Sequence, residues 1–285
     1  MTAETIRVDA HHHVWDLAVR DEPWIVGEAM APIRRSFGLD DLAPLAQATD
    51  ITRTVLVQTV SDTEETWDFL ALAENHELVG AVTGWIDLTA SSVADDLAAL
   101  RDAPGGGYLR AIRHGVQSED DPAWLCRPDV RRGLAAVGAA GLRYELLTIP
   151  VQLPAAIATV AELPDLAFVL DHCGKPEIAA GQREPWTTQI RQLAAHPHVS
   201  CKLSGLVTEA DWADWDVDTL RPYVEVVLEA FGPERVMFGS DWPVCLLATP
   251  YANWVSAAEE LTTSLSSDER AAVFGGTARR FYALT

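Results

Sequence analysis

Eight short apolar runs, most of them followed by a longer stretch with helical spacing, constrain the fold of this chain most strongly. Some runs are apolar almost throughout, such as 54–57 and 167–170. That pattern is typical of strands buried on both faces in a parallel sheet. We therefore predict strands at Ile6–His11, Arg53–Thr59, Leu78–Ile86, Leu109–His114, Arg143–Leu147, Ala167–Asp171, Val199–Leu203 and Val236–Gly239.

Helical spacing between these runs completes the pattern of a parallel barrel. Ser266 and Glu269 form a capping box, which predicts a last helix running from Asp268 toward Phe274. A strand–helix unit repeated eight times indicates a (β/α)8 TIM barrel, and 285 residues suit one such domain over 1–285. An open doubly wound sheet is disfavoured, because no glycine-rich phosphate loop follows the first strand. The other predicted helices are Glu64–Asn75, Val93–Arg101, Pro128–Ala140, Pro154–Leu163, Trp186–Ala195 and Leu220–Phe231.

The charge balance excludes several classes of partner. The chain has 42 acidic and 21 basic residues, a formal net charge of -21. Such a surface repels nucleic acid and anionic membranes, which require basic patches. The four cysteines form no CxxC pattern, and we see neither a signal peptide nor an apolar run of the length of a membrane span. We expect a cytoplasmic protein with a small-molecule substrate, and a homo-oligomer is compatible with the sequence.

Polar side chains gather at the carboxyl ends of the predicted strands, where a barrel of this type carries its site. Successive side chains of a strand point to opposite faces, so His11 and His13 share one face. A His-x-His pair on a strand can hold one cation through two imidazoles. Asp241 follows the last strand and can supply an oxygen ligand or a general base. If the two ends of the chain meet, they form a hydrolytic site.

A set of motifs in chain order resembles the amidohydrolase superfamily. Within it, the motifs are similar to the sugar-lactonase-like branch, which includes L-fuconolactonase and 2-pyrone-4,6-dicarboxylate lactonase. The resemblance covers nearly the whole chain and implies a distorted (β/α)8 barrel that opens a lactone to a hydroxy acid. The motifs are 9–16 (DAHHHVWD), 84–88 (GWIDL), 112–114 (IRH), 171–176 (DHCGKP), 202–206 (KLSGL) and 238–243 (FGSDWP).

The resemblance also implies the site residues. His11, His13, His172 and Asp241 occupy the positions of the motif histidines and the last-strand aspartate, and they are the candidate metal ligands. Many members of the superfamily bridge two metal ions with a lysine on the fourth strand, but 109–114 contains none. We therefore expect one divalent ion, with zinc favoured, or catalysis without a metal. Both alternatives remain open at this point.

The same chemistry serves in either alternative. Asp241 accepts a proton from the attacking water, and His172 donates one to the leaving alkoxide. Without a metal, groups such as His11, His13, Arg113 and His114 polarise the carbonyl. The rival functions are hydrolysis of another ester or an amide, nonoxidative decarboxylation, and a non-catalytic barrel that binds a sugar acid. The predicted substrate-binding residues are Trp15, Trp85, Arg113, His114, Lys175 and Trp242.

Overall fold

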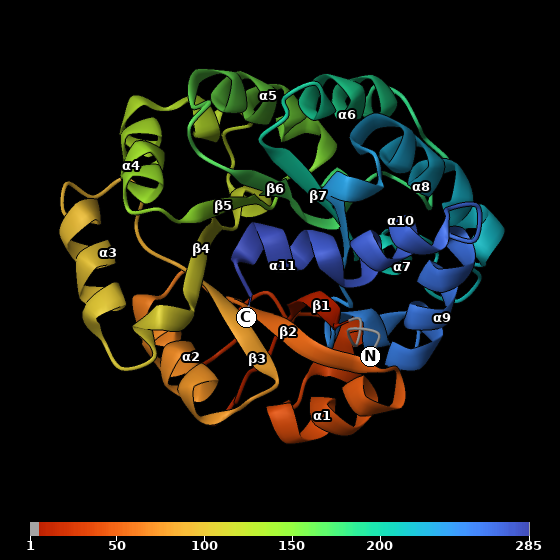
Figure 1. The fold of residues 1–285 in the computed structure, drawn as a ribbon, viewed down its shortest axis with the longest axis horizontal. Helices are drawn as coiled ribbons and strands as arrows, with labels where there is room; N and C mark the ends of the chain where they lie inside the picture. Colours follow the sequence, from red (N-terminus) through yellow and green to blue (C-terminus); the bar gives the residue numbers. More distant parts are fainter. Residues whose placement is uncertain (1–5, 285) are drawn as a thin grey trace.

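The computed structural model describes residues 6–284 and contains one eight-stranded sheet whose strands are hydrogen-bonded in chain order. All neighbouring strands pair in parallel. Each strand overlaps a predicted one, and their ends differ by one or two residues at most, so the predicted TIM barrel is confirmed (Figure 1). The strands are β1 Arg7–His12, β2 Ile51–Val57, β3 Val79–Gly84, β4 Leu109–His114, β5 Arg143–Leu146, β6 Phe168–Leu170, β7 Val199–Leu203 and β8 Val236–Phe238.

Helices surround the sheet and bury their apolar faces against it (Figure 1). The predicted capping box is present, because the Ser266 hydroxyl accepts from the Glu269 N–H and the Glu269 carboxylate accepts from the Ser266 N–H. The helix that follows changes to a π-helical turn at Ala272–Gly276 before the last helix begins. The helices are α1 Leu39–Ala48, α2 Thr63–Asn75, α3 Val93–Asp102, α4 Pro128–Ala139, α5 Leu153–Glu162, α6 Trp186–Ala194, α7 Leu206–Glu209, α8 Val217–Phe231, α9 Tyr251–Leu261, α10 Ser267–Ala271 and α11 Thr277–Tyr282.

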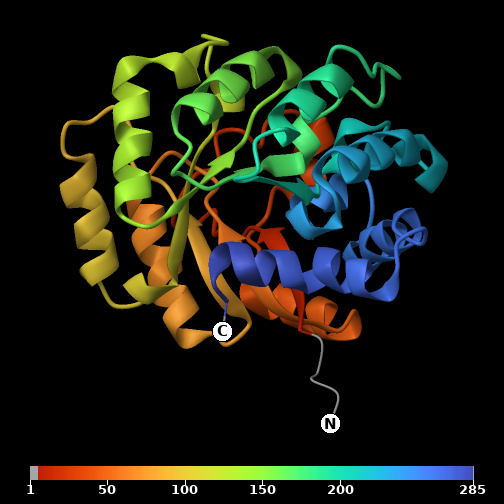
Figure 2. The same ribbon diagram turned by 45° about the horizontal axis from the view of Figure 1, so that its top comes forward.

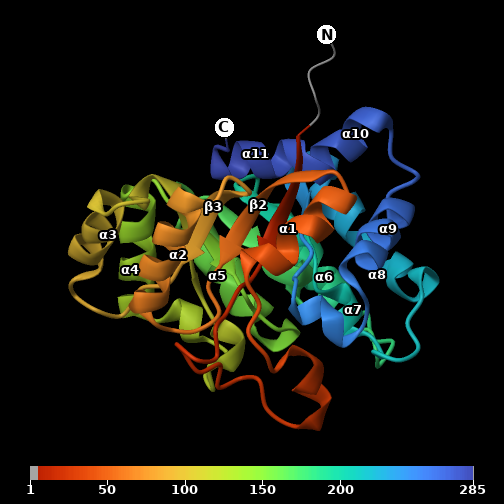
Figure 3. The same cartoon turned by 90° about the horizontal axis from the view of Figure 1, so that it is seen from below.

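The two ends of the barrel are closed differently. Helix α11 lies across the end at which the strands begin, and Ala278 and Tyr282 pack against small apolar side chains of the barrel interior (Figures 1 and 2). The long connection between β1 and α1 projects from the opposite end (Figure 3). It contains a 3-10 helix, η1, at Glu28–Ile33, which contacts a second one, η8, at Val244–Leu247. The carboxyl ends of the strands therefore lie beneath this connection.

The first and last strands meet at the site end of the barrel. The N–H of Asp241 donates to the carbonyl of His11, and the N–H of His13 donates to the carbonyl of Trp242, both at 2.7 Å. Gly239 permits this approach, because a Cβ there would lie 2.7 Å from the Cβ of His11. The two ends of the chain thus meet as the sequence predicts. Within residues 6–284, no helix is both long and apolar enough to cross a membrane.

Candidate active site

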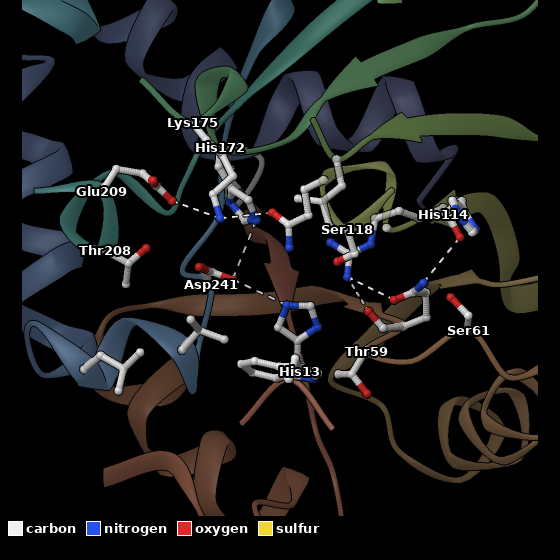
Figure 4. A pocket seen from close by; sticks show the side chains of 18 of the residues that line it. His13, Thr59, Ser61, His114, Ser118, His172, Lys175, Thr208, Glu209 and Asp241 are labelled. Atoms are coloured by element: carbon white, nitrogen blue, oxygen red, sulfur yellow. Dashed lines mark hydrogen bonds and ion pairs between the residues drawn. The ribbon is translucent and has the colours of Figure 1, made fainter. Parts of the chain in front are cut away.

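A cavity of about 430 Å³ opens at the carboxyl ends of the strands (Figure 4). Its floor is built from five side chains at the ends of different strands: Arg113 lies on β4, and His13, Gln58, His172 and Asp241 come just after β1, β2, β6 and β8. Convergence of strand ends at one edge explains how residues so far apart in the chain come together. A cavity of this size suits a small organic substrate.

Three histidines surround one oxygen of Asp241. Its Oδ1 lies 3.4 Å from Nε2 of His13, 3.7 Å from Nε2 of His11 and 3.9 Å from Nε2 of His172. The Nε2 atoms of His11 and His13 are 3.2 Å apart. All four side chains are buried, so these polar atoms are largely shielded from bulk solvent.

An unusual backbone conformation orients the side chains of His172 and Asp241 toward the site. His172 and Asp241 have φ angles of 50° and 56°, in the left-handed region that residues with a Cβ rarely adopt. Non-glycine residues in this region cluster at functional sites, where the surrounding structure holds them in place. Gly205 lies directly beside the His172 ring, and a Cβ there would come within 2.6 Å of Nδ1.

The surroundings leave Asp241 charged and His172 uncharged. Burial would raise the pKa of Asp241, but His172 and a hydrogen bond with His13 lower it below its ordinary value. Burial lowers the pKa of His172 to about 4, although Asp241 and Asp171 act in the other direction. Asp241 is therefore ionised near neutral pH and His172 is neutral. An ionised carboxylate beside a neutral imidazole suits general acid–base chemistry.

A layer of buried charges lies beneath the floor. The Nζ of Lys202 on β7 lies 2.6 Å from Oε2 of Glu145 and 3.1 Å from Oδ1 of Asp171. Nη1 of Arg113 donates to the second oxygen of Asp171 at 3.0 Å. Two cations thus balance two carboxylates inside the barrel. Lys202, Glu145 and Asp171 are absent from the predicted site, although each occurs at or near the end of a predicted strand.

The walls of the cavity differ in polarity. Nζ of Lys175 contacts Oε1 of both Gln117 and Glu209, at 3.1 and 2.9 Å. His114 stacks on Trp124 and contacts Glu119 at 2.8 Å. Apolar side chains from the β1–α1 connection and from η8 line another part of the wall: Trp24, Met30, Val244 and Leu247. Polar groups for several hydroxyls and an apolar surface are therefore available in one cavity.

The predicted site residues divide into three groups. Six of them line the cavity: His13, Arg113, His114, His172, Lys175 and Asp241. His11 lies beneath them and is fully buried. The structure does not bring Trp15, Trp85 or Trp242 to the cavity wall. Trp15 and Trp242 pack at right angles on Phe37, and the indole N–H of Trp85 donates to His114. The tryptophans that line the wall are Trp24 and Trp212, which the sequence motifs do not mark.

The donor atoms around Asp241 fit one metal ion. Ligands of a tetrahedral zinc with bonds of about 2.0–2.1 Å are separated by about 3.4 Å, near the spacings observed here. His11, His172 and Asp241 form one group of converging donors, and His13 adjoins it. His13 already directs Nδ1 to the carbonyl of Val57 at 2.7 Å, the arrangement that leaves Nε2 for a metal. A second group, His11, Glu145 and Asp171, surrounds the Lys202 ammonium instead.

Comparison with known proteins agrees with this geometry. The sequence model of the family described as "Amidohydrolase" matches residues 8–284. The chain belongs to the amidohydrolase family. An L-fucono-1,5-lactonase of Burkholderia multivorans is 41% identical over 98% of this chain and 96% of its own length, and one from Burkholderia ambifaria is 40% identical over the same shares. The predicted family resemblance is confirmed.

A solved structure of the family extends the comparison. An amidohydrolase from Burkholderia multivorans with bound zinc superposes with a TM-score of 0.91 at 41% identity, covering 98% of this chain and 100% of that one. The whole barrel, and not only the motifs, is therefore shared with this family member.

Proposed function

We propose that this protein is a lactonase that opens a small sugar-derived lactone to its hydroxy acid, with Asp241 as the general base. The proposal depends mainly on one observation: Asp241 is an ionised carboxylate on the cavity floor, beside His13 and His172. The similarity to L-fucono-1,5-lactonases over nearly the whole chain supports the choice of a lactone.

The reaction follows from the positions of these groups. Asp241 accepts a proton from water as the water oxygen attacks the lactone carbonyl carbon. Arg113, held by Asp171 and by Gln58, faces the developing oxyanion from the floor. When the ring C–O bond breaks, His172 donates a proton to the alkoxide, and the proton held by Asp241 restores it. The products are a carboxylic acid, which releases its proton to solvent near neutral pH, and a free hydroxyl group.

A divalent ion is compatible with the same site. His13, His172 and Asp241, with His11, would hold it, and zinc suits this mixture of nitrogen and oxygen donors. When bound, such an ion lowers the pKa of bound water and polarises the carbonyl. The zinc in the Burkholderia multivorans structure supports this assignment.

The cavity walls favour a hydroxylated substrate with an apolar part. Lys175, Gln117 and Glu209 offer donors and acceptors for ring hydroxyls. Trp24, Met30, Val244 and Leu247 offer a surface for a ring face or a deoxy carbon. A 6-deoxyaldonolactone such as L-fucono-1,5-lactone has both features.

A pH-indicator screen tests the proposal. Purified protein is mixed with L-fucono-1,5-lactone, other aldonolactones, simple esters and aromatic carboxylic acids, each with and without a chelator. We expect acid release from aldonolactones, fastest with the 6-deoxy compound. Release of carbon dioxide from an aromatic acid, with no lactone opened, would identify a decarboxylase instead. Activity that is lost with chelator and restored by zinc would show that the ion is required.

A further inference from the structure

Glu119, in the connection between β4 and α4, lines the cavity with a carboxylate group that is only partly used. Its Oε1 lies 2.8 Å from Nε2 of His114. Within residues 6–284, its Oε2 makes no hydrogen bond, and neither oxygen forms an ion pair with a lysine or an arginine. The side chain is 33% exposed. Oε2 is therefore free to accept hydrogen bonds from a molecule in the cavity.

The ring of His114 has no nitrogen left for a substrate. The indole N–H of Trp85 donates to its Nδ1 at 3.0 Å, and an indole nitrogen can only donate. A proton on Nδ1 would face that N–H, so the ring carries its proton on Nε2 and donates it to Glu119. The ring also stacks on Trp124, with the ring centroids 4.2 Å apart. Two tryptophans thus fix the ring, and the ring holds Glu119.

Hydrogen bonds also fix the backbone around Glu119. Its N–H donates to the carbonyl of Val116 at 2.9 Å. The same carbonyl accepts from the side chain of Gln152 at 2.7 Å, and the N–H of Gln117 donates to the carbonyl of Leu147 at 3.0 Å. These bonds join the β4–α4 connection to the segment after β5. The carboxylate is therefore preorganised, and little conformational freedom is lost when it binds a hydroxyl group.

The two cations that line the cavity already have carboxylate partners. Arg113 donates to Asp171 at 3.0 Å, and Nζ of Lys175 lies 2.9 Å from Glu209. Glu119 adds a negative charge that, within residues 6–284, is not paired with either of them. This charge repels a lactone that carries a carboxylate group and attracts hydroxyl donors. The charges of the cavity therefore favour a neutral, hydroxylated lactone.

We propose that Glu119 is a specificity-determining residue that selects neutral, polyhydroxylated lactones, and that His114 is its positioning residue. This inference rests on the proposed lactonase function and assigns one contact within it. Oε2 of Glu119 accepts hydrogen bonds from ring hydroxyls of the substrate, while the N–H of His114 holds Oε1. Hydrogen bonds to an ionised acceptor are stronger than those between neutral groups, so selection depends on the charge of Glu119. His114 acts on the substrate through Glu119.

A pair of lactones tests this contact. L-fucono-1,5-lactone carries ring hydroxyls and δ-valerolactone carries none, so the ratio of their kcat/KM values measures selection for hydroxyls. Glu119→Gln keeps the size of the side chain, but its carbonyl must accept from His114, so an N–H₂ group faces the cavity. We expect the ratio to fall at least about tenfold, as for the loss of a hydrogen bond to a charged group. An unchanged ratio in a folded variant would overturn the proposal.

Asp120→Asn is the matched control. Asp120 is the exposed neighbour of Glu119 and does not line the cavity. Its substitution removes the same charge without the contact, so the ratio should stay within about twofold of wild type, as for other surface changes. A fall as large as that in Glu119→Gln would show that no specific contact sets the ratio, and it would count against the proposal.

A second pair of lactones tests the charge. D-glucono-1,4-lactone and D-glucaro-1,4-lactone differ by a carboxylate in place of a hydroxymethyl group, and each is added as a competitor of L-fucono-1,5-lactone. We expect the neutral compound to inhibit wild type more strongly, and Glu119→Gln to reduce this difference. Equal or stronger inhibition of wild type by the anionic compound would contradict the selection of neutral lactones.

His114→Phe tests the positioning role. Phenylalanine keeps the stack on Trp124 but removes the N–H that holds Glu119. We expect the ratio for the first pair of lactones to fall in this variant. It should fall no further when His114→Phe is added to Glu119→Gln, because both changes remove the same contact. Losses that add in the double variant would show that His114 acts independently of Glu119.

Binding of a sugar separates this inference from the proposed function. If wild type opens no lactone, the proposed function fails, and calorimetry with L-fucose, a neutral sugar with the same ring hydroxyls, decides the contact. We expect the Kd of Glu119→Gln for L-fucose to be at least about tenfold higher than that of Asp120→Asn. Equal Kd values, or no binding of L-fucose by wild type, would overturn the assignment of Glu119.

Discussion

The backbone N–H of Ser240 donates a hydrogen bond of 2.7 Å to Oδ1 of Asp9, 231 residues earlier in the chain. The same carboxylate accepts from the N–H of His11 at 3.1 Å and from the hydroxyl of Tyr251 at 3.2 Å. Asp9 is fully buried and therefore joins β1 to the segment after β8 at the level of the site. This link places His11 and His13 beside Asp241.

Gly205 tests how closely the His172 ring is held. A Cβ at this position would collide with the His172 ring, so Gly205→Ala should displace His172. The φ of +65° also disfavours any residue with a Cβ. We expect kcat/KM on a lactone to fall at least about tenfold, and stability to fall by roughly 1–2 kcal/mol from the left-handed backbone alone. Gly107→Ala, with open space at its Cβ and no left-handed φ, is the control. Full activity in a folded Gly205→Ala protein would contradict the close packing.

Glu65 should make stability depend on pH. Burial raises its pKa from 4.5 to about 7, although hydrogen bonds from Thr59 oppose the shift. Because the folded-state pKa is the higher one, the stabilisation is fully present below about pH 4.5 and is lost as the pH rises through about 7. The loss is about 3 kcal/mol at most, from 1.36 kcal/mol per pKa unit.

Denaturant unfolding at pH 5 and pH 8 measures this effect. Glu65→Gln removes the titration, so its free energy of unfolding should fall less between the two pH values than that of wild type. Glu64→Gln changes the exposed neighbouring side chain and should behave like wild type. If the Glu65→Gln and wild-type values change in parallel, Glu65 does not titrate in this range.

Metal content should not exceed one ion per chain. One group of donors converges on Asp241, whereas the Lys202 ammonium occupies the other, formed by His11, Glu145 and Asp171. Protein saturated with zinc and then dialysed should retain at most about one equivalent by elemental analysis. Two retained equivalents, both needed for full activity, would show that Lys202 does not exclude a second ion.

Most of the fold and the core of the site could be predicted from the order of the strands and from the alternation of side chains along them. His13, His172 and Asp241 follow different strands, and parallel strands in chain order bring their ends together. The tryptophans show what the sequence could not predict. A position in a motif does not reveal on which side of a strand end the ring packs. Trp15 and Trp242 therefore lie beside Phe37 and not in the cavity wall.

Lys202 shows a second limit of the sequence. Its partners Glu145 and Asp171 belong to β5 and to the end of β6, and their pairing depends on how side chains meet across the barrel interior. No local pattern around Lys202 predicts those contacts. The sequence signals that set this residue apart are the scarcity of lysine in the chain and its place at the start of the motif 202–206.

Turnover of L-fucono-1,5-lactone by wild type and by Asp241→Asn tests the central claim most directly. Asparagine keeps the size of the side chain but removes the basic oxygen, and loss of a general base typically lowers the rate about 10²–10⁴-fold. Asp21→Asn, at an exposed carboxylate of the β1–α1 connection, is the matched control. We predict that wild type and the control open the lactone at equal rates, and that folded Asp241→Asn retains about one hundredth of that rate or less. A folded Asp241→Asn protein with turnover within about threefold of wild type would contradict the assignment of Asp241 as the base.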